Sequence, residues 1–272
     1  MIRIRWTGAA GLEFTYRNQT LLVDPYHSRP SKRDLFLNPL IPRPALIERY
    51  LKTFPSTLAG IIVGHTHFDH ALDIPVLAGC FKGPVIGSKS LDRLMRIHGL
   101  GPRTVICRGN ERIIISEHAS VTMIPSTHGR AIMGRIPFPG QINATTRLPL
   151  RAPDYRLGDM FNPKLIIGNT SILHVGSAGL PPNPTAKLSC DVLFLCVPGW
   201  KKTPDYPETI IEKTNPDVIV PFHFDDFTRP VPANGAVPLL PFLDMPGFLK
   251  RVNRIAPKAT ISLPGLYEAL TI

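Results

Sequence analysis

Short apolar runs alternate with amphipathic stretches along most of the chain, and Gly, Pro, Asn and Asp separate them. Apolar or alternating runs predict β-strands, whereas apolar residues that recur three and four positions apart predict α-helices. We expect strands at residues 2–6, 12–16, 21–23, 60–63, 105–107, 112–116, 121–125, 164–168, 172–175, 190–197 and 217–222. We expect helices at residues 43–54, 90–98, 206–214 and 245–255.

This order of elements predicts an α/β protein in which two sheets lie between helices. No shift in composition marks a linker, so we expect residues 1–272 to form a single domain. Ser90 is the predicted N-cap of the helix at 90–98, because a serine side chain can accept a hydrogen bond from a free amide of the first turn.

Three histidines and an aspartate, His65, His67, Asp69 and His70, directly follow the apolar run at residues 58–63. A buried strand that ends in a polar turn can direct His65 and His67 toward one ion. Asp69 and His70, at the start of the next helix, can direct their side chains toward a second. The cluster predicts a metal site, and a surface turn rich in histidine is the alternative.

This stretch matches the HxHxDH signature of the metallo-β-lactamase superfamily, and the resemblance extends over nearly the whole chain. Residues 2–25 resemble the first strands of the branch that contains ascorbate 6-phosphate lactonase. Residues 126–129 resemble the turn with the family's third histidine, here His128, and residues 220–225 resemble the late strand with the last one, here His223. The resemblance implies the metallo-β-lactamase fold, an αββα sandwich of two mixed β-sheets flanked by helices, with the site where loops from both sheets meet.

The resemblance also implies the metal ligands and the reaction. In relatives with two zinc ions, one ion is held by residues matching His65, His67 and His128, and the other by residues matching Asp69, His70 and His223. We therefore expect two divalent cations, zinc before manganese or iron. Zinc lowers the pKa of bound water to about 7 and so supplies hydroxide. Asp69 is expected to orient that hydroxide, and His70 to hold the second ion near the leaving group.

One residue departs from the family. Relatives have an aspartate that bridges the two metals, and this chain has Ser177 at that position. A neutral hydroxyl is a weak zinc ligand and does not offset two close dications, so the second ion should be held less tightly. Ser177 can orient a bridging water, His174 or Asp225 can partly replace the carboxylate, or the site can work with one metal.

Three further residues near these stretches are expected to support the site or to lie beside it. Asp24 begins an Asp-Pro pair, and in relatives this aspartate holds a backbone amide or a ligand histidine close to the metal loop. His27 follows closely and is predicted to be a turn residue. His174 is not expected to be a regular ligand, because it ends a predicted strand and can equally face the core.

The formal net charge of +11, from 31 Lys and Arg against 20 Asp and Glu, favours anionic partners. Basic residues crowd the segment after the third histidine, namely Arg130, Arg135, Arg147, Arg151, Arg156 and Lys164. Guanidinium groups beside a metal can bind phosphate or carboxylate. The leading hypothesis is a hydrolase of a small, anionic ester, lactone or phosphodiester. The Pro- and Arg-rich stretch 137–163 is either a functional lid or a surface insertion.

Two other functions stay open. A nuclease acting on RNA or DNA would use the same metals, and a basic surface attracts phosphates, although the sequence carries no recognisable nucleic-acid module. A non-catalytic or mononuclear relative would keep an incomplete site for structure, sensing or redox chemistry, and iron would favour that role.

The composition, 43% hydrophobic and 19% charged, excludes a disordered chain. No apolar run approaches the roughly 18 residues that span a bilayer, and the first residues lack the apolar core of a signal peptide. We expect a cytoplasmic protein without membrane association. The cysteines show no CxxC pair, which indicates a reducing compartment and thiols that act as small buried hydrophobes. They are Cys80, Cys107, Cys190 and Cys196.

Overall fold

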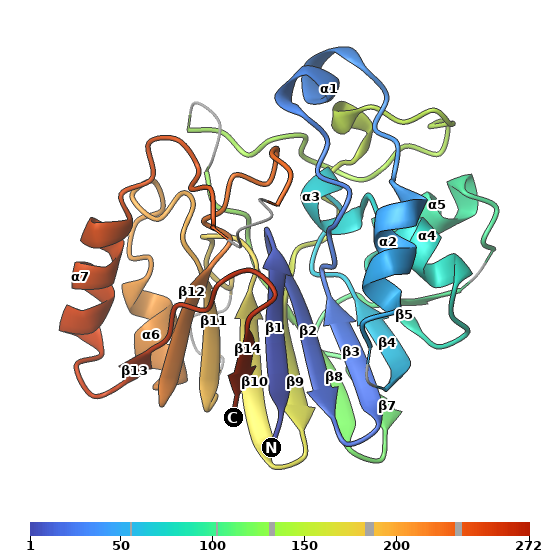
Figure 1. Cartoon of the computed structure of the whole chain (residues 1–272). Helices are drawn as coiled ribbons and strands as arrows, with labels where there is room; N and C mark the ends of the chain where they lie inside the picture. The colour runs from blue at the N-terminus through green and yellow to red at the C-terminus, as the bar shows by residue number, and fades with distance from the viewer. Residues whose placement is uncertain (55, 102, 131–133, 183–187, 232–235) are drawn as a thin grey trace.

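The structure is a computed structural model that describes residues 1–54, 56–101, 103–130, 134–182, 188–231 and 236–272. The described strands form two seven-stranded sheets (Figure 1). The first has the order β14 (Ala269–Thr271), β1 (Arg3–Gly8), β2 (Gly11–Tyr16), β3 (Gln19–Val23), β4 (Thr57–Ile62), β5 (Val85–Gly87), β6 (Thr104–Ile106). The second has the order β13 (Thr260–Ile261), β12 (Val218–Phe222), β11 (Val192–Cys196), β10 (Thr170–Val175), β9 (Phe161–Ile167), β8 (Ala119–Pro125), β7 (Arg112–Ser116).

Both sheets are mixed. In the first, β1 and β2 are antiparallel whereas β3 and β4 are parallel. In the second, β8 and β9 are antiparallel whereas β10 and β11 are parallel. The helices are α1 (Lys32–Leu37), α2 (Pro44–Leu51), α3 (Phe68–Ala71), α4 (Ile74–Gly79), α5 (Lys89–Ile97), the 3-10 turn η1 (Ala152–Asp154), α6 (Glu208–Thr214) and α7 (Met245–Ile255). Two mixed sheets flanked by helices confirm the predicted fold class.

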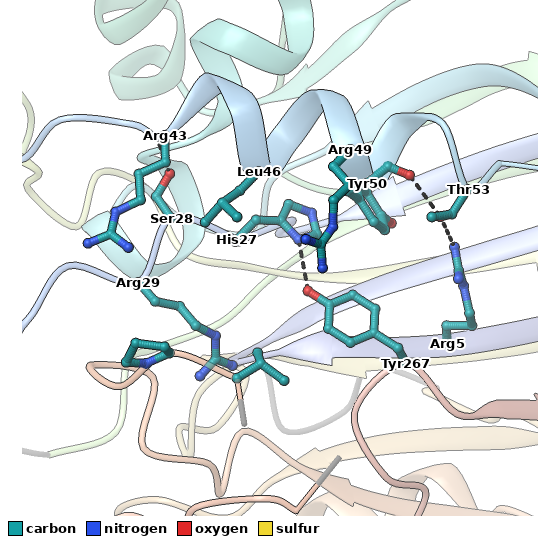
Figure 2. Close-up of a pocket in the computed structure, with 12 residues that line it drawn as sticks. Arg5, His27, Ser28, Arg29, Arg43, Leu46, Arg49, Tyr50, Thr53 and Tyr267 are labelled. Carbon is teal, nitrogen blue, oxygen red and sulfur yellow. Dashed lines mark hydrogen bonds between the residues drawn. The ribbon is translucent and has the colours of Figure 1, made fainter. Parts of the chain in front are cut away.

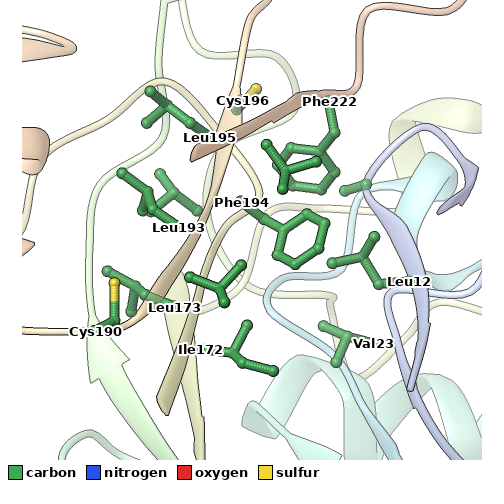
Figure 3. Packing of buried hydrophobic residues seen from close by; sticks show 14 of the residues in the cluster. Leu12, Val23, Ile172, Leu173, Cys190, Leu193, Phe194, Leu195, Cys196 and Phe222 are labelled. Carbon is green, nitrogen blue, oxygen red and sulfur yellow. The ribbon is translucent and has the colours of Figure 1, made fainter. Parts of the chain in front are cut away.

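The main core lies between the two sheets, where alternate strand residues face one another. Figure 3 shows Leu12 and Val23 of the first sheet opposite Ile172 and Phe194 of the second, all of them buried. The rings of Phe14 and Phe194 meet edge to face with centroids 6.0 Å apart. Burial of each such side chain contributes about 1.5–3 kcal/mol, so this interface fixes how the loops of the two sheets meet at the sheet ends.

A second core lies between the first sheet and its helices. Leu22 and Ile61 of the sheet pack with Ile47 of α2, Leu77 of α4 and Leu94 of α5. In Figure 1 these helices lie beside β3, β4 and β5, and α6 and α7 lie beside β11, β12 and β13. No helix formed by the described residues has the length and apolar character needed to cross a bilayer.

Several local predictions need correction. The helix predicted at 90–98 is capped by Ser88, whose hydroxyl accepts a hydrogen bond from the amide of Leu91 at 3.3 Å, so it begins one residue earlier. Ser90 instead donates to the side chain of Gln141. The helix predicted at 43–54 is shorter, and Pro44 lies in its first turn. Cys80 is exposed, whereas the other three cysteines are buried, and all four are free.

Candidate metal centre

The predicted site residues come together at one end of the two sheets. Most of them lie in loops that directly follow a strand. His65 and His67 follow β4, and Asp69 lies on the short helix α3 that comes next. His128 follows β8, and His223 follows β12. Because the core holds both sheets in a fixed relation, loops that are distant in sequence deliver their side chains to one place.

The side chains form two groups whose geometry suits metal binding. His65, His67 and His128 form one, and Asp69, His70 and His223 form the other. Within each group one nitrogen or oxygen atom per residue lies within 4.8 Å of the others. The groups also touch each other, because the rings of His65 and His70 have centroids 3.7 Å apart. The structure therefore brings all the residues of the sequence-predicted ligand set together.

In three of the histidines, one ring nitrogen contacts a hydrogen-bond acceptor outside the two groups. Two of these acceptors are backbone carbonyl oxygens, and the third is the carboxylate of Asp24. His67 Nε2 lies 2.8 Å from the carbonyl oxygen of Pro137, and His128 Nδ1 lies 2.6 Å from the carbonyl oxygen of Gly129. A carbonyl oxygen only accepts, so each ring donates there and leaves its other nitrogen as a lone pair. Outer contacts of this kind fix the ring orientation and tautomer of metal-binding histidines.

Asp24 gives the same support to His70. One carboxylate oxygen lies 2.8 Å from His70 Nδ1, and the other accepts a hydrogen bond from the amide of Gly64 at 2.7 Å. Asp24 therefore holds both a histidine of the second group and the backbone just before the motif. Asp24 and His223 have φ angles of 46° and 64°, in the left-handed region that residues with side chains seldom adopt, and such strain concentrates at functional sites.

Burial sets the protonation states in the first group. It lowers the pKa of His67 to about 3 and that of His128 to about 4, and it holds the pKa of His65 well below its ordinary value. These three imidazoles are therefore neutral at pH 7, which is the form that binds a metal. His65 Nδ1 and His223 Nδ1 are also buried without a hydrogen-bond partner among the described residues.

Charged and polar neighbours shift the protonation states in the second group. Burial disfavours the imidazolium form of His70, but Asp24 and Asp69 outweigh this effect and raise its pKa. Burial alone would raise the pKa of Asp69, yet His70 and His223 pull it below its ordinary range. Asp69 is thus a carboxylate, 3.3 Å from His223 Nε2 and 3.7 Å from His70 Nε2. Mixed nitrogen and oxygen donors of this kind fit zinc or iron.

Ser177 lies in the site, but it supports the loop of the first group. It is buried, and its hydroxyl accepts a hydrogen bond from the amide of Gly129 at 3.0 Å. His174 lies outside both ligand groups, and its Nε2 lies 2.8 Å from the carbonyl oxygen of Ala10. Asp225 is paired with Arg29 instead. Neither His174 nor Asp225 belongs to a ligand group, so the structure gives no support to their replacing a bridging aspartate.

Known structures support this arrangement at the level of the fold. No protein-family model matches the sequence, and no curated protein matches it either. The metallo-β-lactamase fold protein YhfI from Bacillus subtilis superposes with a TM-score of 0.58 at 12% identity, covering 99% of this chain and 98% of that one. This chain has the metallo-β-lactamase fold.

Other structures similar to this metallo-β-lactamase fold differ in chemistry. Igni18, a metallo hydrolase from Ignicoccus hospitalis, has a TM-score of 0.68 at 14% identity, over 100% of this chain and 98% of that one. CmlA, a diiron β-hydroxylase from Streptomyces venezuelae, has a TM-score of 0.64 at 15% identity, over 100% of this chain and 54% of that one. These similarities support the fold. They do not test the predicted resemblance to the ascorbate 6-phosphate lactonase branch.

The two groups open into a cavity of about 560 Å³, here called the metal pocket. Its walls are largely apolar, and they include four aromatic rings, those of Phe36, Phe68, Phe138 and Phe227. Among the described lining residues the only lysine and arginine are Lys32 and Arg151. A pocket of this size suits a small molecule.

The basic segment after His128 contributes less charge to this pocket than the sequence suggested. Of its basic residues only Arg151 is among the lining residues that the structure describes. Arg151 also donates to the carbonyl oxygens of Phe36 and Leu37, which ties the segment to α1. Pro137 and Phe138 line the pocket as well, so the stretch 137–163 forms a wall of the site.

Proposed function

We propose that this protein is a metal-dependent hydrolase that holds two divalent ions, preferably zinc, in the metal pocket. The observation that carries the proposal is the pair of ligand groups, three of whose histidines have one ring nitrogen held by an outer acceptor and the other turned into the group. Side chains that merely stabilised a core would not need five imidazoles and a carboxylate gathered so closely, with ring nitrogens as near as His65 Nε2 and His67 Nδ1 at 3.1 Å. The fold of Igni18, described as a metallo hydrolase, agrees with this proposal.

The chain's own residues supply binding, orientation and charge. Divalent ions held there would act as Lewis acids and would make water a nucleophile near neutral pH. Asp69, ionised and among the pocket's lining residues, accepts a hydrogen bond from the attacking water and orients it. His70 and His223 would hold the second ion, which would offset the charge that collects on the leaving oxygen. Ser177 keeps His128 in place through Gly129.

The lining of the metal pocket favours a substrate with both apolar and anionic parts. The aromatic side chains can pack against an apolar substituent, while Arg151 and Lys32 can bind a negative group at the rim. An ester, lactone or phosphodiester with an apolar substituent fits this lining. A nucleic acid fits less well, because its backbone needs a groove of positive charge.

Metal analysis combined with hydrolysis assays tests this proposal. We expect purified protein to bind two zinc or manganese ions per chain and to hydrolyse bis(p-nitrophenyl) phosphate, a p-nitrophenyl ester or a simple lactone. Asp69→Asn, which keeps the shape and removes the charge, should abolish turnover. Fully metal-loaded protein that turns over none of these substrates, or turnover that survives chelation, would contradict the proposal.

A second candidate is oxidation by two iron ions. The similarity to CmlA favours it, since CmlA is a diiron β-hydroxylase and shares this fold. Protein loaded with iron under exclusion of air and then mixed with oxygen distinguishes the candidates. Oxygen uptake that requires a substrate and Asp69 would favour oxidation, whereas equal hydrolysis with zinc and without oxygen would favour the hydrolase.

A further inference from the structure

A second cavity, of about 510 Å³, lies apart from the metal pocket, and its described lining residues are all different from those of the metal pocket. We call it the arginine pocket, because guanidinium groups and rings dominate its lining (Figure 2). Its lining includes Arg5, Arg29, Arg43, Arg49, His27 and Tyr267. The proposed hydrolase activity gives this cavity no role.

Two of these arginines are already neutralised. Arg5 is buried and forms a bidentate pair with Glu13, whose carboxylate also accepts a hydrogen bond from Tyr50 at 2.8 Å. Arg29 is buried and pairs with Asp225. Each pair cancels its own charge, so these guanidinium groups shape the wall and add little net attraction for a ligand.

The other two arginines keep their charge available. Arg43 and Arg49 are exposed, and neither occurs in an ion pair formed by the described residues. Arg43 lowers the pKa of the exposed Asp34 only as a minor contribution, after nearer hydrogen bonds. The pocket therefore has an excess of about two positive charges at its edge.

Helix α2 places these charges on one side of the cavity. Arg43, Leu46, Arg49 and Tyr50 recur three and four positions apart and so share one helix face. Figure 2 shows this face, with Tyr267 and Arg29 across from it. Leu46 adds an apolar surface between the two charged side chains, which an uncharged part of a ligand can contact.

The wall between these sides is built from packed rings and adds no net charge. The rings of His27 and Tyr50 lie against each other at a tilt, with centroids 3.9 Å apart, and His27 Nδ1 lies 3.2 Å from the Tyr267 hydroxyl. Burial and then the charges of Arg29 and Arg5 lower the pKa of His27 to about 3, so it stays neutral. The backbone amides of His27 and Ser28 donate to Asp73 at 2.5 and 2.8 Å. The cavity is thus formed in advance of binding.

Two nitrogens of the same wall lack partners. His27 Nε2 and Arg29 Nε are buried, and the described residues offer neither a hydrogen bond. A buried polar atom without a partner costs free energy, and such atoms gather where a ligand or water completes the structure. Two residues that line the cavity therefore carry polar atoms that the described part of the protein leaves unsatisfied, an observation that is independent of the free charges.

We propose that the arginine pocket binds a small phosphomonoester. A phosphomonoester carries a charge of about −2 near neutral pH, which matches the two free guanidinium charges of Arg43 and Arg49. Guanidinium groups bind phosphate oxygens in a bidentate manner, which an ammonium group does not do. The organic part of the ligand would rest against Leu46 and the rings of the wall. This proposal does not depend on the reaction at the metal pocket.

Calorimetric titration with phenyl phosphate and with inorganic phosphate tests the proposal on the metal-loaded protein. We expect saturable binding of one phenyl phosphate per arginine pocket. Arg43→Gln/Arg49→Gln, which removes two exposed charges without touching the core, should weaken it at least about tenfold, since each lost contact is charge-assisted. Lys82→Gln/Lys258→Gln removes the same charge from exposed sites elsewhere and should leave the affinity within about twofold, as expected for screened charges.

Phosphate can also bind metal ions, so a second arm separates the two pockets. Binding should persist in His67→Ala and in protein from which metal has been removed by chelation. Loss of binding in these two forms, with retention in the double arginine variant, would assign the ligand to the metal pocket and overturn the proposal. Equal weakening in both double variants would show general charge attraction and would also overturn it, as would the absence of saturable binding to the unaltered protein.

Discussion

The metal pocket and the arginine pocket are similar in size, about 560 and 510 Å³, but they are built from opposite kinds of side chain. The metal pocket gathers imidazoles and one carboxylate beneath aromatic walls. The arginine pocket gathers guanidinium groups, two of them paired inside the protein and two exposed. The first is prepared for cations and the second for anions.

The difference shows why net charge alone is a poor guide to the reacting site. The chain has a formal charge of +11, and the sequence suggested that basic residues after His128 would surround the metals. Only Lys32 and Arg151 supply lysine or arginine to the described lining of the metal pocket. Permanent positive charges beside the metals would repel them, so a cation site tolerates arginine only at its rim.

The pockets are separate, but their walls share supports. Ser28, in the wall of the arginine pocket, donates to Asp73 just after α3, and Arg29 pairs with Asp225 two residues beyond His223. The same backbone segments thus carry both sites. Substitutions confined to one pocket therefore test whether the two sites act independently.

The largest effect is expected at the metal pocket. His65→Ala removes a ligand and should lower kcat/KM by about 10³-fold, the upper end of what loss of one preorganised electrostatic group costs. Metal content and kcat/KM with bis(p-nitrophenyl) phosphate measure this effect together. His118→Ala is the matched control, because this histidine lies outside both groups and contacts Arg17. Full activity in His65→Ala would show that the first group is not the metal site.

The next effect concerns the stability of the arginine pocket. Glu13→Gln leaves Arg5 buried and unpaired, and loss of one partner of a buried pair costs roughly 3–5 kcal/mol in the free energy of unfolding. Urea unfolding of metal-loaded protein measures it, and kcat/KM of the folded fraction should change less than twofold. Arg5→Met/Glu13→Leu removes both charges and should recover most of the stability. A large loss of kcat/KM without loss of stability would show that the pockets are not independent.

A smaller effect is expected when the support of one ligand is changed. Asp24→Asn keeps an oxygen that can accept the hydrogen bond from the Gly64 amide. It then presents its NH2 group to His70, or a neutral oxygen that accepts more weakly than the carboxylate. Loss of such an outer contact costs about 10–100-fold in metal affinity. Competition with a chromophoric chelator measures the affinity, and the unfolding midpoint of the metal-free variant serves as its control. Unchanged affinity would mean that Asp24 supports only the fold.

Much of the fold was accessible from the sequence because its strands are apolar and short. The helix at 245–255 and the strand at 112–116 have the predicted ends, and the other predicted strands all appear with shifted boundaries. The short helices α1 and α4 were missed because one or two turns carry too little periodicity to detect. A capping box of Ser31 and Asp34 marks α1 and was a usable signal. β14 depends on pairing with β1 from the other end of the chain.

The ligand groups could be predicted from the sequence, because a motif and a family resemblance identified their residues. The hydrogen-bond acceptors around them could not be predicted. His67 contacts the carbonyl oxygen of Pro137, and no side-chain pattern encodes a backbone acceptor seventy positions away. The arginine pocket was not predicted at all. Its wall joins Arg5, residues 27–29, α2 and Tyr267, and only the tertiary structure brings these segments together.

The smallest effect concerns the residue that departs from the family. Ser177 lines the metal pocket and accepts from Gly129, and an aspartate there can keep that bond with one oxygen while offering the other to the ions. Ser177→Asp should therefore tighten the second metal about tenfold, or about 1.4 kcal/mol, because a carboxylate offsets the repulsion between two dications. Stepwise metal titration measures it. Ser177→Asn is the matched control, because it adds nearly the same volume without charge. Equal metal affinities in the two variants would show that charge at this position does not control binding of the second ion. The neutral hydroxyl of Ser177 would then not be the reason for weak binding.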